Sequence, residues 1–393
     1  MNIEILSKED LWCAILGGAA LGTGGGGSAI SRQVFDSRVD TLIGKGLKFR
    51  MISPEEIPGG EQIFLNMGVG GGITRIMQER CLRGFGVSDW IKEIDKVNPL
   101  PNWAEIPDEK WRDVSSRRLV ELIGSEPFGY IPFEIGPNII SEMLPAAIEG
   151  KLIINADIAG YRCVPDISLT TLNVIHAPIV PLTVSTSWGD LMVFEKFLSW
   201  QRAEDLVRHI AITSGGGCEG WSSFKDDLIK EGSVNGTVSL AIKLGRLISE
   251  AREKGDNPIS KIVEATSGYN LFEGKIGGYT NEGHGAFVWG NAWIKGTGDY
   301  KGHTLKVWFK NENQMSWIDE KPYVTCPDPF TVVDSNTGLG LSNFRPEWWT
   351  IGREVTLWGM KCADFWRTER GLRIYNPKHF GFDMKYVPIE EMI

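Results

Sequence analysis

The feature that most constrains the fold of this chain is a change of pattern near Gly268. Before it, compact apolar runs typical of buried strands, such as residues 151–157, alternate with stretches of helical periodicity. After it, short apolar runs are separated by Gly, Asn, Asp and Pro, which is the pattern of a β-rich domain. The sequence therefore predicts an N-terminal α/β domain with Gly-rich loops, residues 1–175. The C-terminal domain, residues 176–393, is predicted to be a helical connector followed by a β-rich part.

The sequence also predicts individual elements within these two domains. Ser7 is expected to cap a helix starting near Lys8, with Asp10 at its third position, and Ser28 to cap a second helix. Residues 89–126 are polar and weakly periodic, and are expected to form an irregular insertion or lid. Strands are expected at 47–52, 62–67, 129–134, 151–157, 178–186, 286–294, 304–310, 330–334 and 354–360, and helices at 73–83, 138–150, 203–213 and 234–253.

Composition narrows the classes of partner. The chain has 393 residues and a formal net charge of -9, which argues against nucleic acid because phosphate binding needs a basic surface. The N-terminus lacks the pattern of a secretory signal, and no apolar run reaches the roughly 18 residues of a membrane span. The 6 cysteines are scattered without a CxxC pair, as in a reducing compartment. We therefore expect a cytoplasmic protein that acts on a small molecule and binds neither nucleic acid nor a membrane.

Two glycine-rich stretches are candidates for binding a substrate. The first, residues 21–28, precedes a predicted helix, and the second, residues 68–72, joins a predicted strand to a helix. Glycine permits close approach to the backbone, and the N–H groups of a helix start favour an anion or a developing oxyanion. Neither stretch has the pattern of a nucleotide site, so tight backbone packing is the alternative interpretation. The candidate binding residues here are Thr23, Gly24, Gly25, Gly26, Gly27, Gly70 and Gly71.

Acidic and polar residues follow two of the predicted strands. Glu134 and Asn138 lie between one strand and the next helix. Asp157, Arg162 and Asp166 follow another strand within one short loop. Open α/β sheets gather ligand-binding groups at the carboxyl ends of their strands. Two carboxylates beside an arginine can polarise water, bind a metal or hold a substrate carboxylate, and a capped loop with a surface ion pair is the alternative.

Other polar residues are candidates for metal or ring binding. The histidines show no HxH or HExxH spacing, so the spacing requires no metal. His284 lies in a glycine-bounded turn and is a candidate metal ligand together with Asp157 and Asp166. Asn311, Glu312 and Asn313 follow a predicted strand, where their amide and carboxylate side chains together can clamp an amide ring or form a hairpin turn.

Several stretches together resemble the S-methyl thiohydantoin desulfurase-like family, which often occurs beside hydantoinase/oxoprolinase proteins. The resemblance spans nearly the whole chain, and the order and spacing of the stretches are more specific than any single one. The matching stretches are LGTGGGGS at 21–28, EIGPN at 134–138, NADIAGYRCVPD at 155–166, NGTVSLAIKLGRLI at 235–248, WFKNEN at 308–313, CPDPFTVVDSNTG at 326–338 and NPKHFGFDMKYVPI at 376–389.

The resemblance implies an N-terminal α/β domain, a C-terminal β-rich domain and a cleft between them. It also implies hydrolytic removal of sulfur, or a related hydrolysis, on a hydantoin-like ring. The chain departs from the family pattern at three places near the expected site. Asn155 replaces a second acidic residue, Asp166 replaces a glutamate, and VGGGITRIM at 69–77 replaces a small, proline-containing segment. The site residues that the resemblance implies are Gly24 to Gly27, Glu134, Asn138, Asp157 and Arg162.

The working hypothesis is that water attacks the amide or thioamide carbon of a small five-membered ring. Asp157 or Glu134 would act as general base, and N–H groups of the first glycine stretch would stabilise the tetrahedral anion. Arg162 would hold a substrate carboxylate or a ring oxygen, and Asn138 would orient the ring. A water activated by a divalent metal such as Zn²⁺, held by the same carboxylates, is the close variant.

Two other functions are alternatives at this stage. An ATP-dependent ring opener of oxoprolinase type would use the glycine stretches for phosphate, although a Walker-type lysine is missing. A non-catalytic subunit would instead bind a hydantoinase-like partner. In either case we also expect the chain to form a homo-oligomer.

Overall fold

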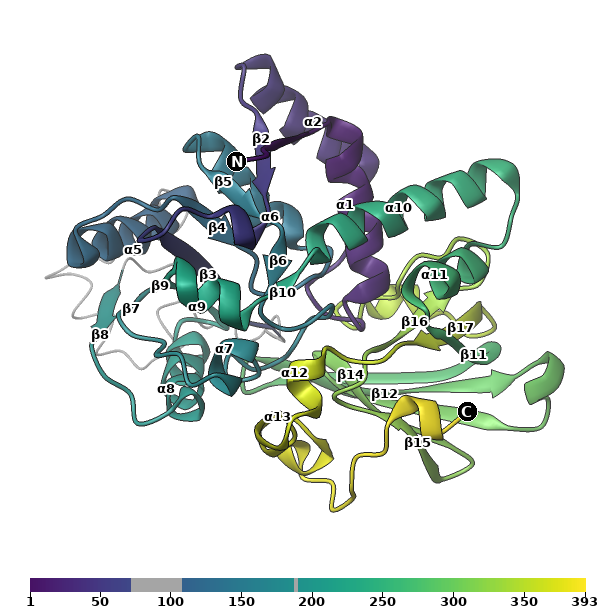
Figure 1. The fold of residues 1–393 in the computed structure, drawn as a ribbon. Coiled ribbons are helices and arrows are strands. Elements are labelled where there is room, and N and C mark those ends of the chain that lie inside the picture. The colour runs from purple at the N-terminus through teal and green to yellow at the C-terminus, as the bar shows by residue number, and fades with distance from the viewer. Residues whose placement is uncertain (72–107, 187–189) are drawn as a thin grey trace, which may run out of the picture.

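The computed structural model describes residues 1–71, 108–186 and 190–393. An α/β part with an eight-stranded sheet lies against a β-rich part with a seven-stranded sheet (Figure 1). The predicted combination of α/β and β-rich parts is thereby confirmed. The predicted helix at 73–83 and residues 89–107 of the predicted lid lie outside the described residues.

The sheet of the α/β part is mixed. Its order is β1-β2-β5-β4-β3-β9-β7-β8, in which β2, β5, β4 and β3 are parallel and the remaining neighbours are antiparallel. The strands are β1 (Glu4–Leu6), β2 (Phe49–Ile52), β3 (Gln62–Gly70), β4 (Gly129–Ile131), β5 (Leu152–Ile154), β7 (Leu182–Thr186), β8 (Leu191–Phe194) and β9 (Gly217–Lys225). Three of these strands follow residue 176, and the division of the chain at 175 and 176 stays a prediction.

Helices cover both faces of this sheet because its strands are apolar on both sides. On β3, Ile63 and Leu65 belong to one core cluster, while Phe64 belongs to the other. The Phe64 side packs against α1 (Lys8–Leu21), α2 (Arg32–Gly44), α5 (Asp108–Ile123), α6 (Ile139–Ile148), α10 (Thr237–Lys254) and α11 (Pro258–Thr266). The Ile63 side packs against α7 (Thr171–Val174), α8 (Trp200–Thr213) and α9 (Asp226–Gly232).

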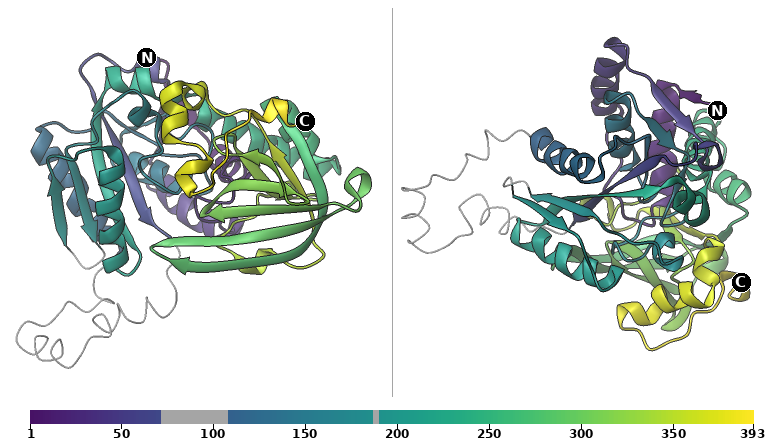
Figure 2. Two further views of the ribbon diagram at one scale, coloured as in Figure 1. Left: turned by 90° about the horizontal axis from the view of Figure 1, so that it is seen from below. Right: turned by 60° about the vertical axis from the view of Figure 1, so that its left-hand side comes forward.

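The sheet of the β-rich part is antiparallel and curves around its own core (Figure 2). On β13, Leu305, Val307 and Phe309 are buried, while the alternate residues are only partly buried. This period of two turns one face to the core and the other to the α/β part and the C-terminal segment. In sheet order the strands are β15 (Lys321–Thr325), β14 (Glu312–Ile318), β13 (Thr304–Lys310), β12 (Phe287–Gly296), β11 (Tyr269–His284), β17 (Glu354–Gly359) and β16 (Phe330–Asp334).

Short elements connect the two parts. The indole N–H of Trp366 donates to the carbonyl of Ala159 at 2.8 Å, and the Tyr375 hydroxyl donates to Gln314 Oε1 at 2.8 Å. The C-terminal segment therefore holds the α/β part and the β-rich sheet together. The short elements are β6 (Ala156–Asp157), which pairs with β10 (Val234–Asn235), α12 (Asp364–Arg367), α13 (Glu369–Ile374), and the 3-10 turns Pro54–Glu56, Gly298–Tyr300, Pro346–Trp348, Pro377–Phe380 and Ile389–Glu391.

Glycine allows α1 to pack directly on α10. A Cβ at Gly17 would lie 1.8 Å from the Ala241 carbonyl oxygen, and one at Gly245 would lie 1.9 Å from the Cys13 carbonyl oxygen. A side chain at either glycine would therefore overlap the backbone of the other helix, so this close approach requires glycine at both positions. This contact fixes the end of α1, from which the first glycine stretch leaves.

Some local predictions are confirmed and others are wrong. Ser7 and Asp10 form the expected capping box of α1. Ser28, however, does not cap the second helix, because its hydroxyl accepts from Arg345 and Ser31 caps α2 instead. The predicted irregular lid is wrong over Asp108–Ile123, which is helix α5 and packs on the sheet through Leu119. The weak periodicity concealed this helix because few of its residues are apolar.

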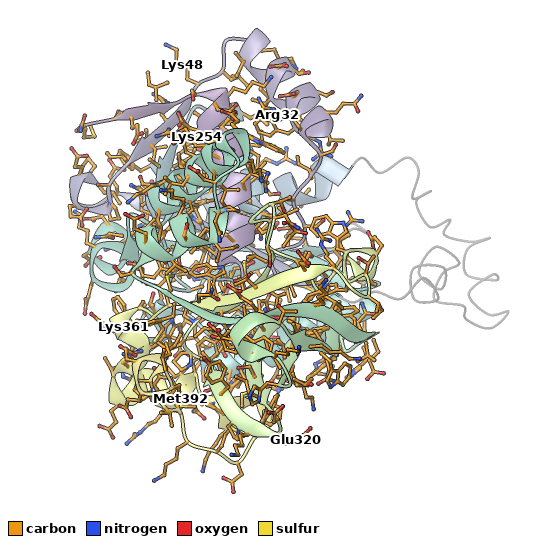
Figure 3. The ribbon with its side chains drawn as sticks, turned by 90° about the vertical axis from the view of Figure 1, so that its right-hand side faces the viewer. Arg32, Lys48, Lys254, Glu320, Lys361 and Met392 are labelled. Atoms are coloured by element: carbon orange, nitrogen blue, oxygen red, sulfur yellow. The ribbon has the colours of Figure 1, made fainter. Side chains whose placement is uncertain are left out.

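Many charged side chains lie on the surface of the molecule. Lys48, Lys254, Glu320 and Lys361 are exposed and lie at its outside (Figure 3). No helix within the described ranges is long and apolar enough to cross a membrane. Unlike these exposed charges, Asp157, Arg162 and Glu312 are ionisable side chains buried inside the molecule.

Candidate functional site

The first glycine stretch forms a tight loop against the β-rich part. Thr23, Gly24, Gly26 and Gly27 all have positive φ, which favours glycine over other residues. The Thr23 carbonyl accepts from Asn313 N at 2.7 Å, and the Gly24 carbonyl accepts from Asn343 N at 2.8 Å. The loop is thus hydrogen-bonded to the second half of the chain.

Functional side chains fill the space that these glycines leave. A Cβ at Gly25 would lie 1.8 Å from Glu312 Oε1, and one at Gly26 would lie 2.6 Å from Cys163 Sγ. Asn138 Oδ1 lies 2.8 Å from the same Gly26 position. The glycines are therefore needed so that the side chains of Glu312, Cys163 and Asn138 can pack against this loop.

Glu134 is the most accessible acid of this group. It follows β4 and is partly exposed, with Oε1 accepting from Asn138 Nδ2 at 3.1 Å and Oε2 from Val164 N at 3.0 Å. Burial raises the pKa of Glu134, against the hydrogen bonds from Val164 and Asn138 and the charge of Arg162, which lower it. A carboxyl with a raised pKa that still meets solvent is suited to proton transfer.

Glu312 is the second acid, and it lies at the turn between β13 and β14. Its side chain is 2% exposed, and Oε2 has no hydrogen-bond partner among the described residues. Burial and the negative charge of Glu134 raise the pKa of Glu312 well above its ordinary value, while Arg162 and the Gly26 N–H oppose that rise. The negative charge of one glutamate therefore disfavours ionisation of the other.

Arg162 supplies the positive charge between the two halves. It is fully buried, and its Nε donates to the Cys163 carbonyl at 3.0 Å and its Nη1 to the Pro327 carbonyl at 3.0 Å. Its Nη2 donates to the Asn313 carbonyl at 3.2 Å and to Gln314 Oε1 at 3.3 Å. The guanidinium is thus occupied by protein acceptors, and it acts on the two glutamates through its charge.

Asp157 is fully buried and is surrounded by donors from its own loop. Its carboxylate accepts the backbone N–H groups of Ala159 at 2.6 Å, of Tyr161 at 3.1 Å, and of Gly160. Burial raises the pKa of Asp157 to about 6, although these hydrogen bonds lower it. The carboxylate therefore holds together the loop that carries Arg162.

The three candidate metal ligands are not gathered in one place. Asp166 accepts from Ser168 N at 2.7 Å and lies 3.3 Å from His379 Nε2. Burial raises the pKa of Asp166, but the hydrogen bond and charge of His379 outweigh it and lower the pKa to about 2. His284 is exposed and stacks on Trp289. Within residues 1–71, 108–186 and 190–393, no group of three or more His, Cys, Asp or Glu side chains could hold a metal.

The second glycine stretch reaches the same turn as the first. Gly70 is not in a loop but ends β3 opposite Gly217. A Cβ at Gly71, which has φ of +143°, would lie 3.1 Å from Asn311 Oδ1. Because Asn311 adjoins Glu312, both stretches lie close to the β13–β14 turn.

The amides of this turn mostly bond to the protein itself. Asn311 Oδ1 accepts from Val288 N at 2.8 Å, and Asn313 Oδ1 accepts from Asn343 Nδ2 at 3.0 Å. Asn138 Oδ1 and Asn343 Oδ1 have no hydrogen-bond partner within the described part of the chain. These two acceptors, Glu312 Oε2 and the amide nitrogen of Gln314 are buried polar atoms of this region without a partner among the described residues.

The structure also adds residues that the sequence prediction did not name. Glu312 was expected only as part of a candidate ring clamp with Asn311 and Asn313 and not as an acid or base, and Cys163 beside Arg162 was given no role. No local sequence pattern pointed to Asn343, because its side chain contacts the Gly24 position only in the folded chain. The thiol of Cys163 is fully buried within hydrogen-bonding reach of Glu134.

Comparison with solved structures supports the fold. A crystal structure of a protein from Chromobacterium violaceum matches with a TM-score of 0.69 and 17% sequence identity, covering 98% of this chain and 100% of that one. At this identity the likeness concerns the fold alone. No curated protein matches the chain.

Family models cover nearly the whole chain. The S-Me-THD-like N-terminal domain matches residues 9–196, and the S-Me-THD-like C-terminal domain matches residues 199–389. The two matches confirm the resemblance that the sequence motifs indicated. The chain belongs to the S-methyl thiohydantoin desulfurase-like family.

Proposed function

We propose that this protein is a hydrolase acting on a small five-membered cyclic amide or thioamide of the thiohydantoin or hydantoin type. The observation that carries the proposal is the pair formed by Glu134 and Glu312 at the glycine loop, with raised pKa values and Arg162 beside them. Family membership supports the thiohydantoin-like ring as the substrate class.

The two glutamates divide the roles of base and acid. Glu134, which meets solvent, takes a proton from the attacking water as its oxygen bonds to the ring carbon. Glu312, kept neutral by burial, gives its proton to the leaving sulfur or ring nitrogen as that bond breaks. The proton gained by Glu134 then passes to Glu312, which restores the starting state.

The other site residues position the ring and balance the charge. Asn138 donates to Glu134 and offers its free Oδ1 to a ring N–H. Arg162 offsets the charge of whichever glutamate is ionised, and Asp157 positions Arg162 through the loop. No step is assigned to a metal, because the donor set in the described residues does not form a metal site.

The test is hydrolysis of a panel of thiohydantoins, hydantoins and small lactams, followed by sulfide or thiol release and by ring opening. Glu134→Gln and Glu312→Gln should each lower kcat about 10²- to 10⁴-fold, because each removes a proton-transfer group. Glu231→Gln, an exposed residue on α9, is the matched control and should retain full activity.

The pH dependence separates the two roles. The rate should rise with pH as Glu134 loses its proton and fall at higher pH as Glu312 loses its own. Glu312→Gln should remove the falling limb from the residual activity. Near-wild-type turnover in both glutamine variants would show that the pair does not carry the chemistry.

A further inference from the structure

The outermost strand of the α/β sheet has an open edge. β8 pairs with β7 on one side, with Leu191 opposite Ser185 and Phe194 opposite Leu182. In the described part of the chain no strand lies on its other side, and β8 stands at the margin of the molecule (Figure 1). The backbone groups along that side are therefore a template for a further strand.

This edge lacks the features that normally protect a free strand. Its residues, Leu191 to Phe194, are all apolar, and the side chain of Leu191 is 39% exposed. Leu198, a few residues on, is 92% exposed, and Phe194 stacks on Phe197 with ring centroids 4.9 Å apart. Free edges usually carry charges, proline or a bulge, and an apolar edge without them marks a site of pairing.

The opposite edge of the same sheet is a weaker candidate. β1 has 3 residues, of which Glu4 is charged and Ile5 is exposed. A charged residue on so short a strand discourages further pairing. The sheet therefore has one edge that is adapted to remain free and one that is not.

Charges flank β8 in a pattern that complements itself. Asp190 precedes the strand and continues its pairing, since Thr186 N donates to the Asp190 carbonyl at 3.1 Å. Lys196 follows the strand, and neither charged side chain forms an ion pair within the described residues. In an antiparallel pair of two copies centred on Val193, Asp190 of each lies opposite Lys196 of the other. The same register sets Met192 opposite Phe194 and Val193 opposite itself, while Leu191 lies opposite Glu195.

We propose that two copies of this chain pair through β8, antiparallel and about a two-fold axis at Val193, so that their sheets become continuous. Such an interface is isologous, and each contact occurs twice. α5 and α8, which pack on β7 from the two faces, would approach their counterparts beside the new strand pair. The inference is independent of the proposed activity, because the site residues lie at the glycine loop and not on β8.

Analytical ultracentrifugation of the full chain tests the pairing. The wild type should sediment as a dimer at micromolar concentration, and Val193→Glu should raise the dimer Kd about 100-fold or more by facing two like charges across the axis. Ile5→Glu places the same charge on the β1 edge and should leave the dimer unchanged. A monomeric wild type, or a dimeric Val193→Glu with unchanged Kd, would overturn the proposal.

Charge exchange tests the register and guards against a folding defect. Lys196→Asp and Asp190→Lys should each weaken the dimer, because each places like charges opposite one another. The double variant Asp190→Lys/Lys196→Asp restores both pairs and should return the Kd to near the wild-type value. A double variant no better than either single one would rule out the register centred on Val193. At concentrations where the wild type is also monomeric, the variants should unfold at the same temperature as the wild type, since dimerisation itself raises the thermal midpoint.

Discussion

At the scale of single residues, three buried or half-buried acids of one region differ in what surrounds them. Asp157 receives three backbone N–H groups, whereas Glu312 Oε2 receives none among the described residues. Glu134 receives two donors but meets solvent. Donors stabilise an ionised carboxylate in place, and their absence leaves a group able to exchange protons. On this difference we base the proposal that Asp157 is structural and that the two glutamates transfer protons.

Asp157→Asn tests the structural role through the pH dependence of stability. Burial raises the pKa of Asp157 from 3.8 to about 6, so the folded state holds this proton more tightly than the unfolded state. The proton bound to Asp157 contributes on the order of 3 kcal/mol to the free energy of unfolding. This contribution is fully present below about pH 4 and is lost as pH rises through about 6. The variant cannot titrate, so its free energy of unfolding should fall less than that of the wild type between pH 4 and 7.

Urea unfolding at several pH values measures this difference. Asp299→Asn, at an exposed aspartate, is the control and should follow the wild type throughout. An unchanged pH dependence in Asp157→Asn would mean that Asp157 titrates alike in the folded and unfolded states.

At the scale of elements, the loop after α1 decides where the acids sit. Its glycines serve two different needs, namely backbone conformation and space. Gly27 has φ of +77°, but a Cβ there would meet nothing within 4 Å. Gly25 has no positive φ, yet its Cβ would overlap Glu312. The loop therefore combines a turn of left-handed backbone with the space that the Glu312 side chain occupies.

Gly25→Ala and Gly27→Ala separate these two needs. Gly25→Ala should displace Glu312 and lower kcat at least about tenfold, since a misplacement near 1 Å is costly for proton transfer. Gly27→Ala should cost roughly 1 kcal/mol of stability through its left-handed backbone while retaining activity. The two measurements are the hydrolysis rate and the thermal midpoint. Equal activities in the two variants would contradict the seating of Glu312 by Gly25.

At the scale of the whole molecule, Arg162 connects the α/β part to the β-rich sheet. Its side chain leaves the loop after β6 and donates to carbonyls of Asn313 and Pro327. It also lies over the ring of Tyr375, 4.9 Å from the centroid. A buried cation with this many acceptors holds both halves in a single arrangement around the site.

Arg162→Met should destabilise the protein by about 3–5 kcal/mol, because it leaves several buried acceptors unpaired beside two glutamates. Arg246→Met removes an ion pair with Asp10 whose arginine is largely exposed, and should cost about 1 kcal/mol or less. Chemical denaturation of both variants provides the comparison. A cost for Arg162→Met no larger than that for Arg246→Met would show that Arg162 does not join the two parts.

The sequence by itself determined the fold class and about half of the elements, although it missed strands such as β8, β9 and the long β11. Periodicity located the core strands, such as β13 and β16, because alternation along a strand is a local property. The cap at Ser7 and the family motifs are equally local. Residues that gather at one loop, such as Glu134 and Asn138, were identified for the same reason, since they share a short segment.

Only the tertiary structure decided which of these residues act together. Glu312 lies in the same site as Glu134 because the β13–β14 turn packs against the glycine loop. The spacing of the two residues along the sequence does not predict this proximity. The environment of Asp157, and hence its role, depends on three N–H groups that the fold of its loop directs inward. Burial, which sets the pKa values of all three acids, is a property of the packed molecule and not of any segment.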